Sequence, residues 1–216
     1  MLRFLAIFTL LAAFVVIALS FHQPPMRLMP TPKAFQIAGP ELFGSNPDLL
    51  QKPRMEVFYA TNRLPVGVRN NRLYAVVPGR DMHAGVATIR VGGEDTTWDE
   101  IYDLSTRGAL PDDPRRPRLY LDRLTELATF EEGYPAPAGA RAWYGLIDSA
   151  LEKSRDPDII IYVHGANSTV ERAVGQAAQL RHFTAENSVV VLFAWPTAEN
   201  FLRYSKDLVT AFGAAP

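Results

Sequence analysis

The sequence lacks cysteine altogether, in a chain of 216 residues. This absence excludes disulfide bonds, thiolate nucleophiles, thiolate metal ligands and a lipid-modified N-terminal cysteine. A chain of this length can bury a sizeable core without covalent cross-links. The missing cysteine therefore does not argue against a location outside the cytoplasm.

An excess of positive charge is also lacking, because 22 lysines and arginines face 23 aspartates and glutamates. Binding to the phosphates of a nucleic acid needs a basic field, so we expect no nucleic-acid partner. The one arginine cluster, Arg115, Arg116 and Arg118, follows Asp112 and Asp113. Mixed charge of this kind is typical of a solvated loop.

Recognisable motifs for metals and cofactors are missing as well. Gly92 and Gly93 do not lead into a helix with a phosphate-binding lysine, so the sequence predicts no phosphate loop. The histidines show no metal-ligand spacing, and we expect neither a metal nor an organic cofactor. These histidines are His22, His83, His164 and His182.

The N-terminal residues 1–21 contain an apolar segment, residues 4–21, that carries no charge and follows Arg3. The segment is long enough for a transmembrane helix. It also resembles a signal peptide, with Ala18 and Ser20 at a small-x-small cleavage candidate. Both alternatives place the rest of the chain outside the cytoplasm, either anchored with the N-terminus inside or exported to the periplasm.

Residues 22–54 are rich in proline, which interrupts helices and central strands, and this range is predicted to be an extended spacer or a strap lying on the domain. The domain itself is predicted to occupy residues 55–216. Its first half shows strand patterns at residues 55–60, 73–77 and 86–91.

The run from Ile159 to Val163 is unbroken and apolar, and the chain leaves it through His164 and Gly165. Such a run is typical of a strand buried on both faces, as in parallel sheets. With the elements around it, the run predicts an α/β fold with a mostly parallel sheet and flanking helices. These elements are a helix at 143–154, a helix to about 184, a strand at 189–194 and a last helix to about 212.

The turn after this strand contains the candidate site residues. Ser168 and Glu171 fit a capping box at the start of the next helix, and this role accounts for the serine better than a nucleophilic one. Gly165 is expected to form a tight turn. We favour His164 as a hydrogen-bonded support of the turn over a catalytic base.

Several short pieces, in their order along residues 29–207, resemble a bacterial family of poorly characterised α/β-hydrolases of the esterase or lipase type. The pieces are Met29 to Pro32, Val57 to Arg63, His83 with Gly85, Tyr162 to Gly165 with Asn167, Ala177 to Gln179, Phe193 to Pro196, and Tyr204 with Asp207.

The resemblance implies ester or acyl hydrolysis by a serine, and an oxyanion-hole amide from Ala166 or, less favoured, Asn167. The family usually has an aromatic residue where this chain has Ala166. The serine of such enzymes sits in a G-x-S-x-G-like turn, and no serine here lies two residues after a glycine. The nucleophile, acid and histidine are therefore expected beyond Pro216, as in a truncated reading frame, a fragment or a degenerate copy.

On this interpretation the chain is the N-terminal portion of a serine hydrolase-like protein, inactive alone. A small ester would be its substrate only when the missing half is supplied. The alternative is a non-catalytic, membrane-tethered binding or scaffold domain of hydrolase ancestry, which would be stable without further strands.

Overall fold

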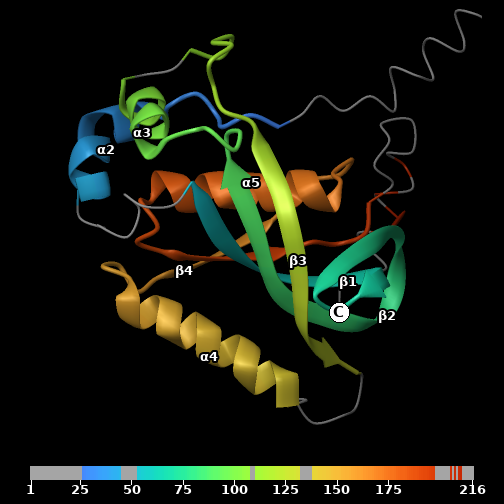
Figure 1. Cartoon of the computed structure of the whole chain (residues 1–216). Helices are drawn as coiled ribbons and strands as arrows, with labels where there is room; N and C mark the ends of the chain where they lie inside the picture. The colour runs from blue at the N-terminus through green and yellow to red at the C-terminus, as the bar shows by residue number, and fades with distance from the viewer. Residues whose placement is uncertain are drawn as a thin grey trace, which may run out of the picture.

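The structure is a computed structural model, and it places elements on both sides of one central sheet (Figure 1). The segment 1–21, predicted to be an anchor or signal peptide, lies outside the described residues. None of the described helices combines the length and apolar character that a membrane crossing requires. The described residues are 26–44, 53–107, 110–131, 138–197, 205, 207, 209 and 210.

The predicted α/β fold is confirmed, and the sheet is mixed. The strand order is β3-β2-β1-β5-β4. β5 pairs in parallel with β1 and β4, whereas β1 with β2 and β2 with β3 pair antiparallel. The strands are β1 (Arg54–Val68), β2 (Asn71–Val91), β3 (Leu119–Phe130), β4 (Ile159–Val163) and β5 (Val189–Phe193).

The antiparallel part is larger than the sequence patterns indicated. The two strands expected at 73–77 and 86–91 are one continuous strand, β2. Pro78 is tolerated in it because Pro78 lies opposite Arg63 at a register shift, where ladder bonds are interrupted. Residues 119–130, for which no strand was predicted, form β3 on the far side of β2.

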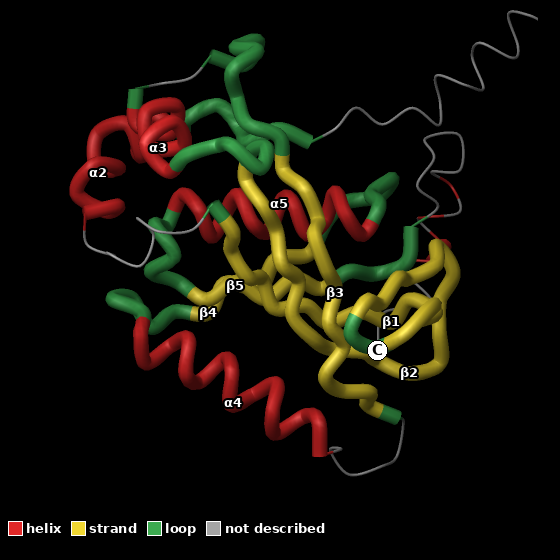
Figure 2. Tube along the Cα trace, viewed as in Figure 1, coloured by secondary structure: helices red, strands yellow, loops and turns green. Residues whose placement is uncertain are grey.

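Helices cover the two faces of the sheet (Figure 2). Trp143 of α4 packs with Phe58 of β1 in one cluster, and Val174 of α5 packs with Val57 in another. Because neighbouring strand residues point to opposite faces, α4 and α5 lie on opposite sides. The described helices are α2 (Lys33–Gly44), α3 (Trp98–Thr106), α4 (Ala138–Lys153) and α5 (Val170–Phe183).

β4 corrects the prediction of a central strand buried on both faces. It lies at the edge of the sheet, and within the described part of the chain only β5 pairs with it. Ile160 and Tyr162 pack toward α5, whereas Ile161 and Val163 are 71% and 55% exposed. One face of β4 is thus partly buried against α5, while the other face is exposed.

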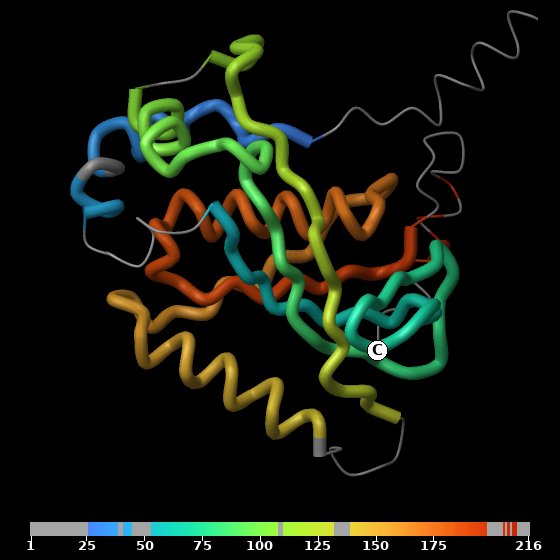
Figure 3. The backbone as a smooth tube through the Cα atoms, viewed as in Figure 1, coloured from blue at the N-terminus to red at the C-terminus, as the bar shows by residue number. Residues whose placement is uncertain are grey.

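The range predicted to be an extended spacer contains a helix. Residues 26–32 form a strap along the domain, tied by hydrogen bonds from the Leu28 amide to Pro117 and from the Leu119 amide to Met26 (blue in Figure 3). α2 follows, although Pro40 within it has no amide hydrogen to donate. Burial of Phe35 and Phe43 against the rest of the protein offsets this loss.

Candidate functional site

The carboxyl ends of β4 and β5 lie at the same end of the sheet because the two strands are parallel. Residues 164–169 follow β4, and residues 194–197 follow β5. β1 runs parallel to β5 and reaches the same end of the sheet at Thr61. Ligands of open α/β folds bind at this carboxyl end of the parallel strands, and the predicted site residues lie there.

Thr61 and Arg63 hold the two loops together. The Thr61 hydroxyl donates to the Ala194 carbonyl at 2.5 Å and accepts from the Arg63 amide at 3.1 Å. The Arg63 guanidinium is fully buried and donates to the carbonyls of Trp195 at 3.1 Å and Ser168 at 2.9 Å. A planar guanidinium can bind several oxygens in fixed directions, so Arg63 sets the distance between the loops.

His164 lies inside this arrangement and is 2% exposed. Its ring stacks on Trp195 with centroids 5.5 Å apart, and the Trp195 indole donates to the His164 carbonyl at 2.7 Å. Burial lowers the pKa of His164, so the ring is neutral near pH 7. Its Nδ1 lies 2.7 Å from the Gly165 carbonyl oxygen. These contacts fit the predicted supporting role, which remains a prediction.

Ala166 and Asn167, the predicted oxyanion-hole residues, differ in their amides. The Asn167 amide donates to Asp207 Oδ2 at 2.9 Å, and Asn167 has a left-handed φ of 56°. The Ala166 amide has no hydrogen-bond partner among the residues that the structure describes. Of the two amides, Ala166 is thus the one that could donate to a ligand, and its role as an oxyanion donor stays a prediction.

Unpaired buried atoms are concentrated at the same place. Four buried side-chain polar atoms lack a partner within the described ranges, and three of them belong to Asn62, His164 and Asn167. The fourth belongs to Arg181 on α5. Buried polar atoms are normally satisfied, and exceptions often mark places where a ligand or a reaction is accommodated.

The predicted capping box of Ser168 and Glu171 is not formed at the start of α5. The N-cap of α5 is Thr169, whose hydroxyl accepts from the Arg172 amide at 3.0 Å. Ser168 instead faces the Thr197 hydroxyl, which accepts from the Ser168 amide at 3.2 Å and donates to its carbonyl at 2.7 Å. Arg63 and Thr197 thus hold Ser168 before the helix begins. Glu171 lies in the first turn, where its charge favours the positive helix end.

A serine–histidine pair that the sequence analysis missed lies elsewhere. Ser105 Oγ of α3 is 2.8 Å from His182 Nε2 of α5, and the two residues are 0% and 1% exposed. Phe43 and Trp98 pack around the imidazole, with centroids 5.2 and 6.3 Å away. The pair has hydrolase-like chemistry but no access for a substrate. No spacing in the sequence indicated it, because 77 residues separate its members.

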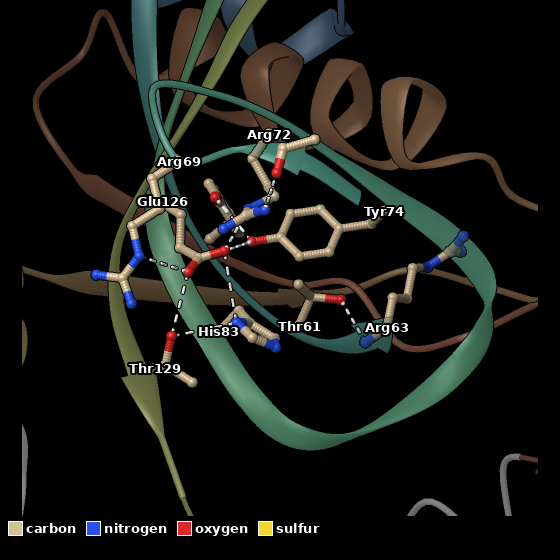
Figure 4. Close-up of polar contacts among 10 residues, drawn as sticks. Thr61, Arg63, Arg69, Arg72, Tyr74, His83, Glu126 and Thr129 are labelled. Atoms are coloured by element: carbon tan, nitrogen blue, oxygen red, sulfur yellow. Dashed lines mark hydrogen bonds and ion pairs between the residues drawn. The ribbon is translucent and has the colours of Figure 1, made fainter. Parts of the chain in front are cut away.

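A second polar cluster, also missed, surrounds Glu126 of β3, which is 4% exposed (Figure 4). Its carboxylate accepts from Arg72 Nε at 2.6 Å, from the Tyr74 hydroxyl at 3.2 Å and from the Thr129 hydroxyl at 3.1 Å. Burial alone would raise the pKa of Glu126, but the Arg72 hydrogen bond and the charge of His83 bring it below its ordinary value.

The Glu126 cluster closes the far end of the β1–β2 hairpin. The Glu126 amide donates to the Arg69 carbonyl at 2.7 Å, and Arg69 Nε lies 3.5 Å from its carboxylate. The Tyr74 hydroxyl lies 3.1 Å from that of Tyr59, and burial raises the pKa of both. These contacts satisfy the buried Glu126 carboxylate from several sides, so the cluster stabilises the hairpin.

Within the described ranges, no three histidine, cysteine, aspartate or glutamate residues lie close enough together to hold a metal. The groups that the structure does place at this end of the sheet are backbone amides and a neutral imidazole, held by a buried guanidinium. Such groups can bind and orient an anion or a carbonyl oxygen.

Comparison with known proteins bears on this end of the sheet. No curated protein and no solved structure matches the chain. One family matches residues 141–211, which include β4, β5 and the loops after them. The part of this chain that forms the candidate site is thus similar to the family described as alpha/beta hydrolase of unknown function (DUF900).

Proposed function

We propose that residues 164–169 are the oxyanion side of a serine-hydrolase-type site for ester or acyl substrates. The observation that carries this proposal is the Ala166 amide, which has no partner among the described residues and lies in a loop that Arg63 and Trp195 hold in place. A preorganised amide of this kind stabilises a tetrahedral intermediate by about 3 kcal/mol. The similarity of residues 141–211 to alpha/beta hydrolases supports the same assignment.

The nucleophile would have to come from polypeptide outside these 216 residues. No serine in the sequence lies two residues after a glycine, as a nucleophile elbow requires. Ser168 is 5% exposed and held by its backbone, and Ser105 is enclosed with His182. The chain alone is thus expected to hydrolyse esters little or not at all.

An assay with p-nitrophenyl butyrate tests the missing nucleophile. The purified chain should release nitrophenol no faster than buffer containing an inert protein. Turnover that disappears in Ser168→Ala or Ser105→Ala would identify a nucleophile in this chain and overturn the proposal. Turnover that survives both substitutions would show a different site, with the same consequence.

Amide hydrogen exchange tests the donor itself. The Ala166 amide should exchange quickly, whereas the Asn167 amide should be protected by its bond to Asp207. Protection of Ala166 equal to that of Asn167 would mean that its N–H is already bonded and not available to a substrate oxygen.

One observation favours a second function, a non-catalytic binding or scaffold domain. The Asp207 carboxylate accepts from the Asn167 amide, directly after Ala166. A negative charge there opposes the charge that develops on a substrate oxygen. This function predicts a stable, monodisperse chain in size-exclusion chromatography and circular dichroism, whereas exposed strand edges in an incomplete hydrolase favour association.

We further propose that the apolar segment 4–21 anchors or exports the domain, so that it lies outside the cytoplasm. An anchored chain stays in the membrane fraction after an alkaline wash, and an exported one appears in the periplasm at reduced mass. Full-length protein in the cytosolic fraction would contradict both forms of the proposal.

A further inference from the structure

Two neighbouring cavities are lined by residues of α5 and of the strap 26–32, and one of them also by residues of α2. Their volumes are about 560 and 380 Å³. Met29, Gln179 and Leu180 line both, so the cavities adjoin. A hydrogen bond from the Met29 amide to Gln179 Oε1 ties the strap to α5 at the shared wall.

The larger cavity is cationic. Arg27, Arg116 and Arg172 line it, and its lining contains no aspartate or glutamate. Arg27 Nη1 donates to the Arg116 carbonyl at 2.6 Å, and Arg116 Nε to the Leu28 carbonyl at 2.8 Å. Because these acceptors are neutral, the bonds hold the guanidinium groups in place without cancelling their charge. The Arg172 side chain has no partner within the described part of the chain.

The smaller cavity is apolar. Apart from Gln179 and Thr184, every residue that lines it is apolar, including Phe35, Leu42 and Phe183. Arg172 in the first cavity and Phe183 in the second lie about 16 Å apart along α5, at the rise per residue of an α-helix. The two adjoining cavities thus lie end to end along the helix, and together they are called the groove. One end of the groove thus attracts an anion, and the other end offers apolar side chains.

We infer that the groove binds a fatty acid, with its carboxylate at Arg172 and its chain extended along α5 to Phe183. Guanidinium groups pair with carboxylates in a fixed geometry, and an unpaired arginine beside an apolar wall suits an anionic head on an apolar tail. The cavity volumes are in the range of small-molecule sites. This inference does not depend on the proposed hydrolase function, since it needs no nucleophile.

Photo-crosslinking of the full chain in phosphatidylcholine nanodiscs tests it. The probe is dodecanoate with a diazirine at the end of the chain, and the matched control is the corresponding alcohol. The acid should label peptides of α2 and of the C-terminal half of α5, and the alcohol should label them about tenfold less. Equal labelling by the alcohol, or labelling confined to other segments, would overturn the inference.

Two substitutions separate the head from the tail. Arg172→Gln should lower labelling by the acid about tenfold and leave labelling by the alcohol unchanged. Ala38→Phe should fill the apolar cavity and lower labelling by both probes, with folding checked by circular dichroism. Arg141→Gln makes the same charge change on α4, on the opposite face of the sheet, and should have no effect. An equal loss in Arg141→Gln would refute a specific carboxylate site.

Competition with unlabelled ligands tests the choice of head group. Dodecanoate should displace the probe, and dodecyl phosphate should not displace it better. Displacement by dodecyl phosphate at concentrations about tenfold lower would contradict the carboxylate assignment.

Discussion

Two arginines, Arg63 fully buried and Arg72 partly buried, show how differently the two halves of the sheet are built. In the antiparallel half, Arg72 pairs with the Glu126 carboxylate, and the surrounding hydroxyls complete the set (Figure 4). In the parallel half, Arg63 donates to carbonyls of the loops after β4 and β5. Three unpaired polar atoms lie near Arg63, and the described Glu126 cluster contributes none. The Glu126 cluster, whose polar atoms pair within it, is here called closed, and such a cluster contributes to stability. The loops around Arg63 are called open, because they contain polar atoms without a described partner that a ligand could bind.

The largest effect is expected from breaking the closed cluster. Glu126→Gln leaves the partly buried Arg72 guanidinium without its buried counter-charge, and the free energy of unfolding should fall by about 3 kcal/mol. Urea denaturation measures it. The control Asp122→Asn removes a more exposed carboxylate, paired with Arg54 and Arg90, and should cost about 1 kcal/mol or less. Equal losses in the two variants would mean that Glu126 is not a special anchor.

Loss of Arg63 is expected to cost about 3 kcal/mol, because Arg63→Met leaves buried carbonyls without donors. The fluorescence of Trp195 should also change, since its loop is released. Arg63→Lys keeps the charge but not the planar fork, and should recover only part of the stability. Full recovery with lysine would show that charge alone matters there.

A buried histidine, His182, provides a test through the pH dependence of stability. Burial lowers the pKa of His182 to about 4, from an ordinary value of 6.5. As pH falls, His182 is protonated in the unfolded chain before it is protonated in the folded chain. The stability that depends on the neutral, buried His182 ring is therefore complete above pH 6.5 and is lost as pH falls toward 4. Between pH 7 and pH 5 the free energy of unfolding should fall by about 2 kcal/mol from His182 alone.

The variant His182→Gln isolates this contribution, because it keeps a polar partner for Ser105 and does not titrate. Its stability should depend less on pH than that of the natural chain between pH 7 and pH 5. His164 titrates in both proteins and cancels in the difference. Identical pH profiles would show that His182 is not buried in its neutral form.

The smallest effect concerns the start of α5. Thr169→Ala removes the N-cap hydroxyl and should cost about 1 kcal/mol in thermal or urea unfolding. Ser168→Ala should cost less, because the bonds of Ser168 described above are made by its backbone. A larger loss in Ser168→Ala would restore Ser168 as the cap that its sequence position indicated.

Local patterns located the elements of the C-terminal half well. The apolar runs of β4 and β5 and the helical spacing of Trp143 and Ile147 were legible without any structure. α3 and β3 were missed because prolines and charges interrupt their neighbourhood, and their burial depends on β2 and α5. α2 was missed since the prolines outweighed Phe35 and Phe43 in the pattern, whereas burial outweighs them in the fold.

The sequence by itself determined the strands and helices of the C-terminal half, that no thiol is present, and that no serine follows glycine at elbow spacing. These properties depend on residues within a few positions of one another. Only the tertiary structure decided that β4 is an edge strand and that Arg63 donates to the Ser168 carbonyl. It also decided that three arginines line a cavity beside an apolar one. Arg63 and Ser168 are 105 residues apart, and contacts at that separation are set by packing, not by local pattern.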